Sequence, residues 1–333
     1  MFDGFIFTDF FERIKKQKIL IIGDVMIDTY LWGSVQRVSP EAPVPIVSNI
    51  IEENRLGGAA NVALNVKSLG AIPILCSVIG GDERGKLFLE LLEDQNLSDV
   101  GITVDDYRIT TQKTRVISGA KHLLRVDEEI ESALSNRLQS AFIDVIQNIL
   151  KTGGIAAIIF QDYNKGVIAP KVIEKVTSQA KKQHIPVMVD PKFRNFSNYK
   201  NITLFKPNLK ELLKGLKIEA QKTDIDILIE SGQEFRKKQK QEILLLTLSE
   251  KGMLVLKEGA HYYIPAFQRD IIDVSGAGDT VIAVTAVAYA GGMNAPQLAT
   301  LSNLAGGLVC EKSGVVPIER ELLEKECERM TDY

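Results

Sequence analysis

Short apolar runs alternate with amphipathic helical patterns along much of this chain. We predict strands at 18–22, 73–79, 155–160, 186–190, 203–206 and 242–248, and helices near 134–151, 169–183, 208–215 and 224–240. Strands joined through helices form right-handed βαβ units, which place the strands side by side in a parallel sheet. The alternation therefore predicts an α/β fold, with a mostly parallel central sheet and helices on both faces.

One stretch of the N-terminal half departs from this alternation. Pro40, Pro43 and Pro45 disfavour a helix between Gly33 and Leu56, where β-branched residues favour extended structure. The segments 113–118 and 123–127 also have strand character. We expect these segments to form a small β-sheet lid, inserted from about 33–56 and 108–128. Because no linker or composition break divides the chain, we expect one domain over residues 1–333.

Composition excludes several classes of function. The net charge of −3 gives no basic surface for nucleic acid, and no apolar run approaches the ~20 residues of a membrane span. The N-terminus carries acids where a secretory signal would carry basic residues. Cys76, Cys310 and Cys327 are odd in number and widely spaced, which is typical of reduced thiols. We therefore expect a cytoplasmic protein without nucleic-acid or membrane partners.

A glycine-rich turn at 273–280 leads into the Ala-rich apolar run 281–290. Gly276 and Gly278 lack a Cβ, so the backbone around Ala277 can turn its amides toward a ligand. The first amides of a helix have no intrahelical partner and carry partial positive charge, which favours a transferring phosphoryl group. Asp279 has two interpretations here: an acid that caps the helix, or a general base beside the phosphate.

A second glycine pair lies near the end of the N-terminal segment. Gly57 and Gly58 precede a helical pattern that begins near Asn61, whose amide offers both a donor and an acceptor. Asp24 and Asp28 follow the first predicted strand, at the sheet edge where α/β proteins bind ligands. These short acids either hold sugar hydroxyls or stabilise a turn.

The other predicted strands also end in polar clusters. The clusters are 161–166, 190–192, 206–211 and 247–252, and each of them alone is compatible with a capped turn. Because parallel strands end at one edge of a sheet, together they supply carboxylates, lysines and hydroxyls for phosphates and Mg²⁺. The segment 80–87 lacks the Ser or Thr that a P-loop requires, because Leu87 follows Lys86.

These motifs resemble the ribokinase-like (PfkB-type) carbohydrate kinases, and the resemblance covers about residues 15–320. The segments 57–61 and 273–280 carry it. The segments 23–30, 37–45, 162–166 and 190–192 more closely resemble the kinase half of the bacterial heptose-7-phosphate kinase/adenylyltransferases. The resemblance implies a ribokinase-like fold with a β-sheet lid, and ATP and Mg²⁺ as cofactors.

The resemblance also implies roles for individual residues. Asp279 corresponds to the catalytic base, and Gly276, Ala277 and Gly278 correspond to the anion hole. Residues implied in nucleotide binding are Asn208, Leu209, Lys210, Glu211, Thr247, Ser249, Gly252 and Asn303. Glu211 is also implied in Mg²⁺ binding, either directly or through water. Residues implied in sugar-phosphate binding are Asp24, Asp28, Gly57, Gly58, Asn61, Arg115, Lys165 and Lys192, with the last three as candidates for the existing phosphate.

The implied reaction is ATP-dependent phosphorylation of O1 of D-glycero-D-manno-heptose 7-phosphate, for ADP-heptose and lipopolysaccharide core synthesis. No nucleotidyltransferase signature follows in this sequence, so we expect a separate protein to transfer the adenylyl group. Such kinases often pair through exposed lid edges, and we expect a homodimer.

Three alternatives remain open from the sequence. Another sugar or sugar-phosphate kinase of the same class, acting on ribose or a hexose phosphate, has the same motifs. A dinucleotide-dependent oxidoreductase requires Gly-x-Gly-x-x-Gly after the first strand, where this chain has 23–28 without that pattern. A non-catalytic sugar or nucleotide sensor would not need the carboxylate of Asp279.

Overall fold

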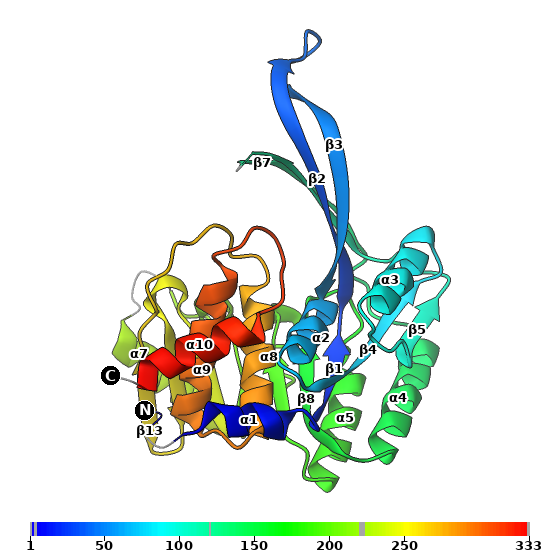
Figure 1. Ribbon diagram of the computed structural model, residues 1–333. Coiled ribbons are helices and arrows are strands. Elements are labelled where there is room, and N and C mark those ends of the chain that lie inside the picture. Colours follow the sequence, from blue (N-terminus) through cyan, green and yellow to red (C-terminus); the bar gives the residue numbers. More distant parts are fainter. Residues whose placement is uncertain (1, 3–4, 120, 220–223, 332–333) are drawn as a thin grey trace.

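The computed structural model describes residues 2, 5–119, 121–219 and 224–331 (Figure 1). The helices in this part of the chain are α1 (Phe7–Ile14), α2 (Ala59–Ser68), α3 (Glu83–Asp94), α4 (Asn136–Lys151), α5 (Pro170–Lys182), α6 (Leu209–Leu216), α7 (Ile225–Gln239), α8 (Ala277–Ala290), α9 (Ala295–Val309) and α10 (Arg320–Thr331). Short 3-10 turns, η1 (Phe193–Asn195) and η3 (Ser249–Lys251), follow two of the strands.

The strands form two sheets. The central sheet consists of β1 (Lys18–Gly23), β4 (Ile72–Gly80), β5 (Gly101–Asp105), β8 (Ile155–Gln161), β9 (Val187–Asp190), β10 (Leu204–Phe205), β11 (Ile243–Thr247), β12 (Met253–Lys257) and β13 (Ala260–Ile264). The second sheet consists of β2 (Val25–Val38), β3 (Pro45–Gly58), β6 (Gln112–Ser118) and β7 (Lys121–Glu128).

The central sheet has the order β13-β12-β11-β10-β9-β8-β1-β4-β5. All its neighbouring pairs from β11 to β5 are parallel, and β12 and β13 add an antiparallel edge. The prediction of a mostly parallel sheet with helices is therefore confirmed. Strands β12 and β13 were not predicted, although Gly259, with φ +69°, marks the turn of a hairpin between them.

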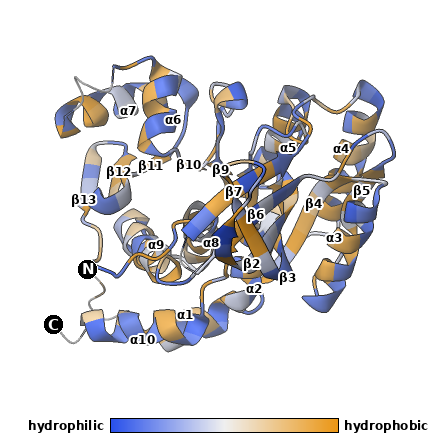
Figure 2. Cartoon of the chain, turned by 90° about the horizontal axis from the view of Figure 1, so that it is seen from above, coloured by the Kyte–Doolittle hydropathy of each residue, from blue (hydrophilic) through white to orange (hydrophobic). Residues whose placement is uncertain are grey.

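Each buried strand contributes side chains to two hydrophobic cores, because successive side chains point to opposite faces of the sheet. Along β1, Ile19 and Ile21 pack with α2, α8 and α9, whereas Leu20 and Ile22 pack with α4, α5 and α6. Figure 2 shows these two groups of helices on opposite sides of the strands. Every residue from Asp279 to Ala288 of α8 is buried. Among the described helices, none combines the length and apolar character needed to cross a bilayer.

The second sheet has the order β3-β2-β6-β7, and Figure 1 shows the β2–β3 hairpin projecting far from the helices. This separate sheet confirms the predicted small sheet, but β2 begins at Val25 rather than near Gly33. The segment after Asp24 pairs with β3 on one edge and with β6 on the other, which satisfies its backbone groups as a strand. Asp28 therefore lies within a strand, not in a turn.

The sheet contacts the rest of the molecule through Tyr30 and Arg55. The hydroxyl of Tyr30 accepts a hydrogen bond of 2.8 Å from the amide of Val315. The guanidinium of Arg55 lies over the Tyr30 ring, 4.8 Å from its centroid, and donates to the carbonyl of Val315 over 3.1 Å. These contacts tie the base of the second sheet to the segment that follows α9.

Candidate active site

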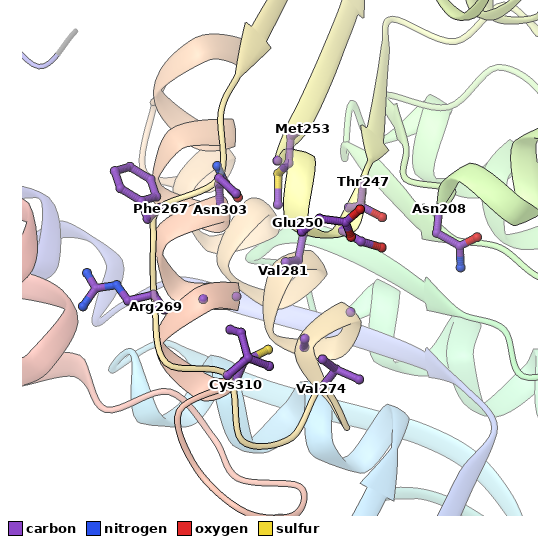
Figure 3. Close-up of a pocket in the computed structure, with 18 of the residues that line it drawn as sticks. Asn208, Thr247, Glu250, Met253, Phe267, Arg269, Val274, Val281, Asn303 and Cys310 are labelled. Atoms are coloured by element: carbon purple, nitrogen blue, oxygen red, sulfur yellow. The ribbon is translucent and has the colours of Figure 1, made fainter. Parts of the chain in front are cut away.

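A cavity of about 1120 Å³ lies beside the carboxyl ends of β9, β10 and β11 and the N-terminus of α8 (Figure 3). Because parallel strands end together, residues distant in sequence meet here. The lining includes seven residues predicted to bind nucleotide or phosphoryl groups: Asn208, Thr247, Ser249, Gly252, Ala277, Gly278 and Asn303. It does not include Gly276, Asp279, Leu209, Lys210 or Glu211, although Glu211 contacts two lining residues, as described below.

Asp279 lies in the first turn of α8 and is 3% exposed. Its Oδ2 accepts a hydrogen bond of 2.9 Å from the amide of Asn61. Its Oδ1 accepts from the amide of Gln161 over 2.9 Å and from the hydroxyl of Tyr163 over 2.6 Å. Burial raises the pKa of Asp279 to about 7, against the lowering effect of the hydrogen bonds from Asn61 and Tyr163. A carboxylate with this pKa is suited to accept a proton near neutral pH.

The glycine-rich turn begins α8 at Ala277, four residues earlier than the apolar run alone indicates. Gly276 has φ +79°, a conformation that favours glycine. Gly278 is helical instead, and a Cβ there would meet Asp190 and Lys206 only at ordinary contact distances of 3.7 and 3.8 Å. The absent Cβ of Gly278 therefore leaves room at the cavity wall.

Backbone amides point out of this helix end. The amide of Ala277 donates weakly to the carbonyl of Val274 over 3.3 Å. Within the described ranges, the amides of Gly276, Gly278 and Asp279 have no protein acceptor. Unpaired first-turn amides and the helix dipole together bind anions. Of the three residues predicted to form an anion hole, Gly276 and Gly278 therefore have free amide donors, whereas the amide of Ala277 is partly used.

Two ion pairs line the approach to the anion hole. Lys206 lies 3.0 Å from Asp190, and both side chains are almost fully buried. Lys192 pairs with Glu211, and the pKa of Lys192 is raised because Asp190 and Glu211 outweigh the opposing effect of burial. Lys192 lines the cavity with Asn208, whereas Arg115 is not among the lining residues. Lys192 is therefore a candidate for contact with a nucleotide phosphate, whereas the resemblance implied that it binds the phosphate of the sugar.

Asn208 and Glu211 form a reciprocal cap at the start of α6. The Asn208 side chain accepts from the Glu211 amide over 2.8 Å, and the Glu211 carboxylate accepts from the Asn208 amide over 2.9 Å. With Lys192 on its other oxygen, Glu211 accepts one hydrogen bond on each oxygen. No group of three or more His, Cys, Asp or Glu side chains in the described residues is arranged to hold a metal ion. As a carboxylate beside the cavity, Glu211 could contact Mg²⁺ directly or through water.

The far end of the cavity is apolar. Figure 3 shows Phe267, Met253 and Val281 near Asn303. The amide of Asn303 donates to the carbonyl of Pro265 over 2.8 Å, which orients this side chain at the cavity wall. Apolar walls with few oriented polar groups are typical of sites for flat heterocycles. This end can accept a nucleobase while the phosphates extend toward α8.

Asp24 was predicted either to hold sugar hydroxyls or to stabilise a turn, and its carboxylate is hydrogen-bonded to backbone amides of the protein. It is 1% exposed, and its carboxylate accepts hydrogen bonds from the backbone amides of Tyr163, Lys165 and Val167 at 2.8, 3.1 and 3.0 Å. Burial and the nearby charge of Asp162 raise the pKa of Asp24 to about 6, against these three amides. Asp24 therefore anchors the loop 162–167.

The glycine pair makes room for protein atoms rather than for a ligand. A Cβ on Gly57 would meet Oδ2 of Asp28 at 2.1 Å, and one on Gly58 would meet the carbonyl of Asp24 at 2.5 Å. Gly58 also has φ +61°. Asp28 forms a buried ion pair with Arg115, whose guanidinium lies over the Tyr30 ring. The glycines thus permit the close packing of β3 against β2 and the carbonyl of Asp24.

Lys165 is 8% exposed and lies 2.6 Å from Glu129 and 3.3 Å from Glu131. The three cations predicted to hold the sugar phosphate, Arg115, Lys165 and Lys192, each have carboxylate partners. A phosphate at any of them takes the place of a carboxylate. The structure brings Asn61 to Asp279 directly, whereas Arg115 and Lys165 lie in separate ion pairs at the second sheet.

Four residues of the site were not assigned roles from the sequence: Gln161, Tyr163, Asp190 and Lys206. All four lie in the polar clusters that follow strands, so their positions gave a signal. Sequence position alone does not reveal that Gln161 and Tyr163 converge on one carboxylate oxygen. That depends on the register of β8 beside β1 and on the path of the 162–167 loop.

Comparison with protein families matches residues 16–321 to the model described as pfkB family carbohydrate kinase. A relative from Pelobacter propionicus, named Bifunctional protein HldE, is 40% identical over 315 residues, covering 93% of this chain. A protein of the same name from Helicobacter hepaticus is 38% identical over 313 residues, again covering 93% of this chain. This chain covers 63% and 64% of these two relatives, less than two thirds of their length.

Solved structures with 18% and 17% identity share the fold. Phosphofructokinase-2 from Escherichia coli, in complex with substrates and products, has a TM-score of 0.77, and the match covers 95% of this chain and 100% of the phosphofructokinase-2 chain. The Arabidopsis thaliana ribokinase, complexed with ribose and ATP, has a TM-score of 0.69, and the match covers 93% of this chain and 98% of the ribokinase chain. The ribokinase-like fold is thereby confirmed. The chain belongs to the pfkB family of carbohydrate kinases, phosphotransferases that act on a sugar hydroxyl.

Proposed function

We propose that this kinase transfers the γ-phosphoryl group of ATP to O1 of D-glycero-D-manno-heptose 7-phosphate. The observation that carries the proposal is Asp279, a buried carboxylate with unpaired α8 amides beside it and a nucleotide-sized cavity in front of them. The relatives named Bifunctional protein HldE and the segments 37–45, 162–166 and 190–192 support heptose 7-phosphate as the sugar.

In the proposed reaction, Asp279 takes the proton of the sugar hydroxyl as its oxygen attacks the γ-phosphorus. The amides of Gly276 and Gly278 stabilise the charge of the transferring group without reorganising. Lys192 and Lys206 lie where they can contact the nucleotide phosphates. Mg²⁺, when bound with ATP, supplies neutralisation of phosphate charge, and Glu211 would hold it through water.

On the sugar side, Asn61 and Asp28 are the candidates to bind hydroxyl groups. Asn61 already donates to Asp279, so it can position a hydroxyl next to the base. Arg115 and Lys165 are the candidates to bind the existing phosphate, because they are the two predicted cations outside the nucleotide cavity. We propose no sugar contact for Asp24, whose carboxylate is used by the loop 162–167.

A panel of acceptors tests the substrate. ADP release is measured with heptose 7-phosphate, free heptose, fructose 6-phosphate and ribose, and the product is mapped by NMR. We expect the highest kcat/KM with heptose 7-phosphate and the new phosphate on C1. A higher kcat/KM with fructose 6-phosphate or ribose would replace heptose by the other sugar, and absence of turnover with all of them would favour a non-catalytic sensor.

We also propose a cytoplasmic homodimer that pairs through the second sheet. Several apolar residues of its strands and hairpin tip are more than a third exposed: Val35, Val38, Val44, Ile50, Ile51, Leu124 and Val126. Burying such residues against a second copy would remove apolar area from water. The free thiols of Cys76, Cys310 and Cys327 are compatible with a reducing compartment. Sedimentation analysis of Ile51→Lys against the unchanged chain tests the pairing, and an unchanged monomer in both would exclude it.

A further inference from the structure

The two oxygens of the Asp279 carboxylate differ in their partners. Oδ1 accepts two hydrogen bonds, from Gln161 and Tyr163, whereas Oδ2 accepts one, from Asn61. Each carboxylate oxygen has about two lone-pair positions. In the described part of the chain, Oδ1 is therefore saturated, and Oδ2 keeps one free acceptor position on the Asn61 side.

We propose that Oδ2 of Asp279 is the oxygen that takes the proton, and that Tyr163 is a positioning residue that holds Oδ1. This inference rests on the proposed kinase function. As the sugar O–H bond breaks, its proton passes to Oδ2 and its oxygen forms the new bond to the γ-phosphorus. The bond from the γ-phosphorus to the bridging oxygen breaks, and its electron pair leaves with ADP.

Tyr163 can hold Oδ1 because its own backbone is fixed. The amide of Tyr163 donates to Asp24 over 2.8 Å. The carboxylate of the preceding residue, Asp162, accepts from the amide of Asn164 over 2.8 Å. Asp162 also accepts from the hydroxyl of Tyr199 over 2.8 Å. Two buried carboxylates therefore fix the loop at whose start Tyr163 lies. The Tyr163 side chain reaches from this loop to the first turn of α8.

The surroundings of Asp279 decide the sign of the effect of Tyr163. Burial and the charge of Asp190 raise the pKa of Asp279, whereas Asn61, Tyr163 and Lys206 lower it. The Gln161 amide donates to Asp279 over 2.9 Å and also to Asp190 over 3.2 Å, so it is shared between the two carboxylates. The hydroxyl of Tyr163 is thus a donor that favours the ionised form of Asp279.

Tyr163 remains a donor over the working range of pH. Burial, together with the charges of Asp279, Asp190 and Asp28, raises the pKa of Tyr163 well above its ordinary value. The ammonium of Lys192 lies 5.5 Å from the centroid of the Tyr163 ring, on the side of the nucleotide cavity. The phenol therefore stays protonated and donates to Oδ1 rather than acting as a base itself.

Tyr163→Phe tests this role, with Tyr199→Phe as a matched control. Both changes remove one buried phenolic hydroxyl from an aspartate, but Tyr199 donates to Asp162 rather than to Asp279. We expect Tyr163→Phe to move the acidic limb of kcat/KM to higher pH. At pH 6.5 kcat/KM should fall about 10- to 100-fold, the size expected for a lost hydrogen bond to a charged group, and should largely recover at pH 9. Tyr199→Phe should leave that limb in place.

A second measurement does not depend on substrate. The ¹³C resonance of the Asp279 carboxyl group, identified by its loss in Asp279→Asn, is titrated in the full chain without ligands. Its pKa should rise in Tyr163→Phe and stay unchanged in Tyr199→Phe. If this shift occurs while every sugar in the acceptor panel fails, the proposed substrate is wrong and the role of Tyr163 stands.

A variant that keeps the hydroxyl covers the case in which Tyr163→Phe does not fold. 3-Fluorotyrosine at position 163 is a stronger donor of nearly the same size, so it should lower the pKa of Asp279 and move the acidic limb to lower pH. An unchanged pKa of Asp279 in folded Tyr163→Phe, or no shift with 3-fluorotyrosine, would overturn the proposal. So would an equal shift in Tyr199→Phe.

Discussion

Two carboxylate pockets lie at the same edge of the central sheet, one around Asp24 and the other around Asp279. Both carboxylates are at most 3% exposed, each accepts three hydrogen bonds, and burial raises both pKa values, to about 6 and about 7. The donors differ. Asp24 accepts from three backbone amides of one loop, whereas Asp279 accepts only from side chains, which belong to Asn61, Gln161 and Tyr163.

This difference separates a structural carboxylate from a chemical one. Backbone amides can leave Asp24 only if the loop 162–167 unfolds, so its oxygens are committed to the fold. Side-chain donors around Asp279 leave one acceptor position on Oδ2, and the unpaired amide of Gly278 lies in the same helical turn. Burial and a raised pKa by themselves therefore do not identify the base. The kind of donor and the neighbouring unpaired amides are what favour Asp279 as the proposed base.

The largest expected effect is on the chemical pocket. Asp279→Asn keeps the size of the side chain but removes the proton acceptor, so kcat should fall about 10²- to 10⁴-fold, or roughly 3 to 5.5 kcal/mol of barrier. ATP binding, measured by calorimetry, should be retained because the nucleotide residues are unchanged. An unaltered kcat would refute the assignment of Asp279 as the base.

The structural pocket should respond in stability. Asp24→Ala leaves three buried amides without an acceptor, which should lower the free energy of unfolding by about 2 to 5 kcal/mol. Chemical denaturation measures the loss, with Asp99→Ala as a control at an exposed aspartate, where a change within about 0.5 kcal/mol is expected. If Asp24→Ala kept full stability while it lost only sugar affinity, Asp24 would belong to the substrate site after all.

The two glycines next to Asp279 sharpen the comparison further. Gly278→Ala places a Cβ at ordinary distances from Asp190 and Lys206 in a helical position, so stability should rise by about 0.5 to 1 kcal/mol. The methyl group takes space at the anion hole, and kcat should fall about tenfold, a barrier increase of roughly 1.4 kcal/mol. Gly276→Ala should instead lose about 1 to 2 kcal/mol of stability, because φ is +79°. Thermal unfolding and turnover, measured on both variants, decide between these outcomes.

The last prediction concerns the pH dependence of stability. Both aspartates have a folded-state pKa above the ordinary 3.8, so the folded chain holds more protons than the unfolded chain between pH 3.8 and about 7. Their contribution is fully present below pH 3.8 and is lost as the pH rises through 6 and 7. The free energy of unfolding of Asp279→Asn, measured relative to that of the unchanged chain, should therefore increase from pH 5 to pH 8. Denaturation at both pH values measures this difference, and a decrease from pH 5 to pH 8 would contradict the raised pKa of Asp279.

Sequence periodicity determined the parallel centre of the main sheet, although β5, β12 and β13 were not predicted. The strands at 18–22, 155–160 and 242–248 have apolar side chains for both faces, so burial between two helical layers follows from their composition. The glycine-rich turn before α8 was likewise readable, because only glycine adopts the conformation of Gly276 easily. The polar residues at strand ends predicted which edge of the sheet carries the site. These are local properties, and local sequence encodes them.

Only the tertiary structure decided which polar group meets which partner. Asp24 and Asp279 are both short acids after glycine, yet the 162–167 loop covers the first and side chains from α2 and β8 reach the second. The absent Cβ of Gly57 leaves room for the Asp28 side chain, and Lys192 lines the cavity proposed for the nucleotide. These outcomes depend on strand register and loop path. Contacts between residues distant in the chain set both, such as Asn61 and Asp279 at a separation of 218 positions, and no local pattern of residues encodes them.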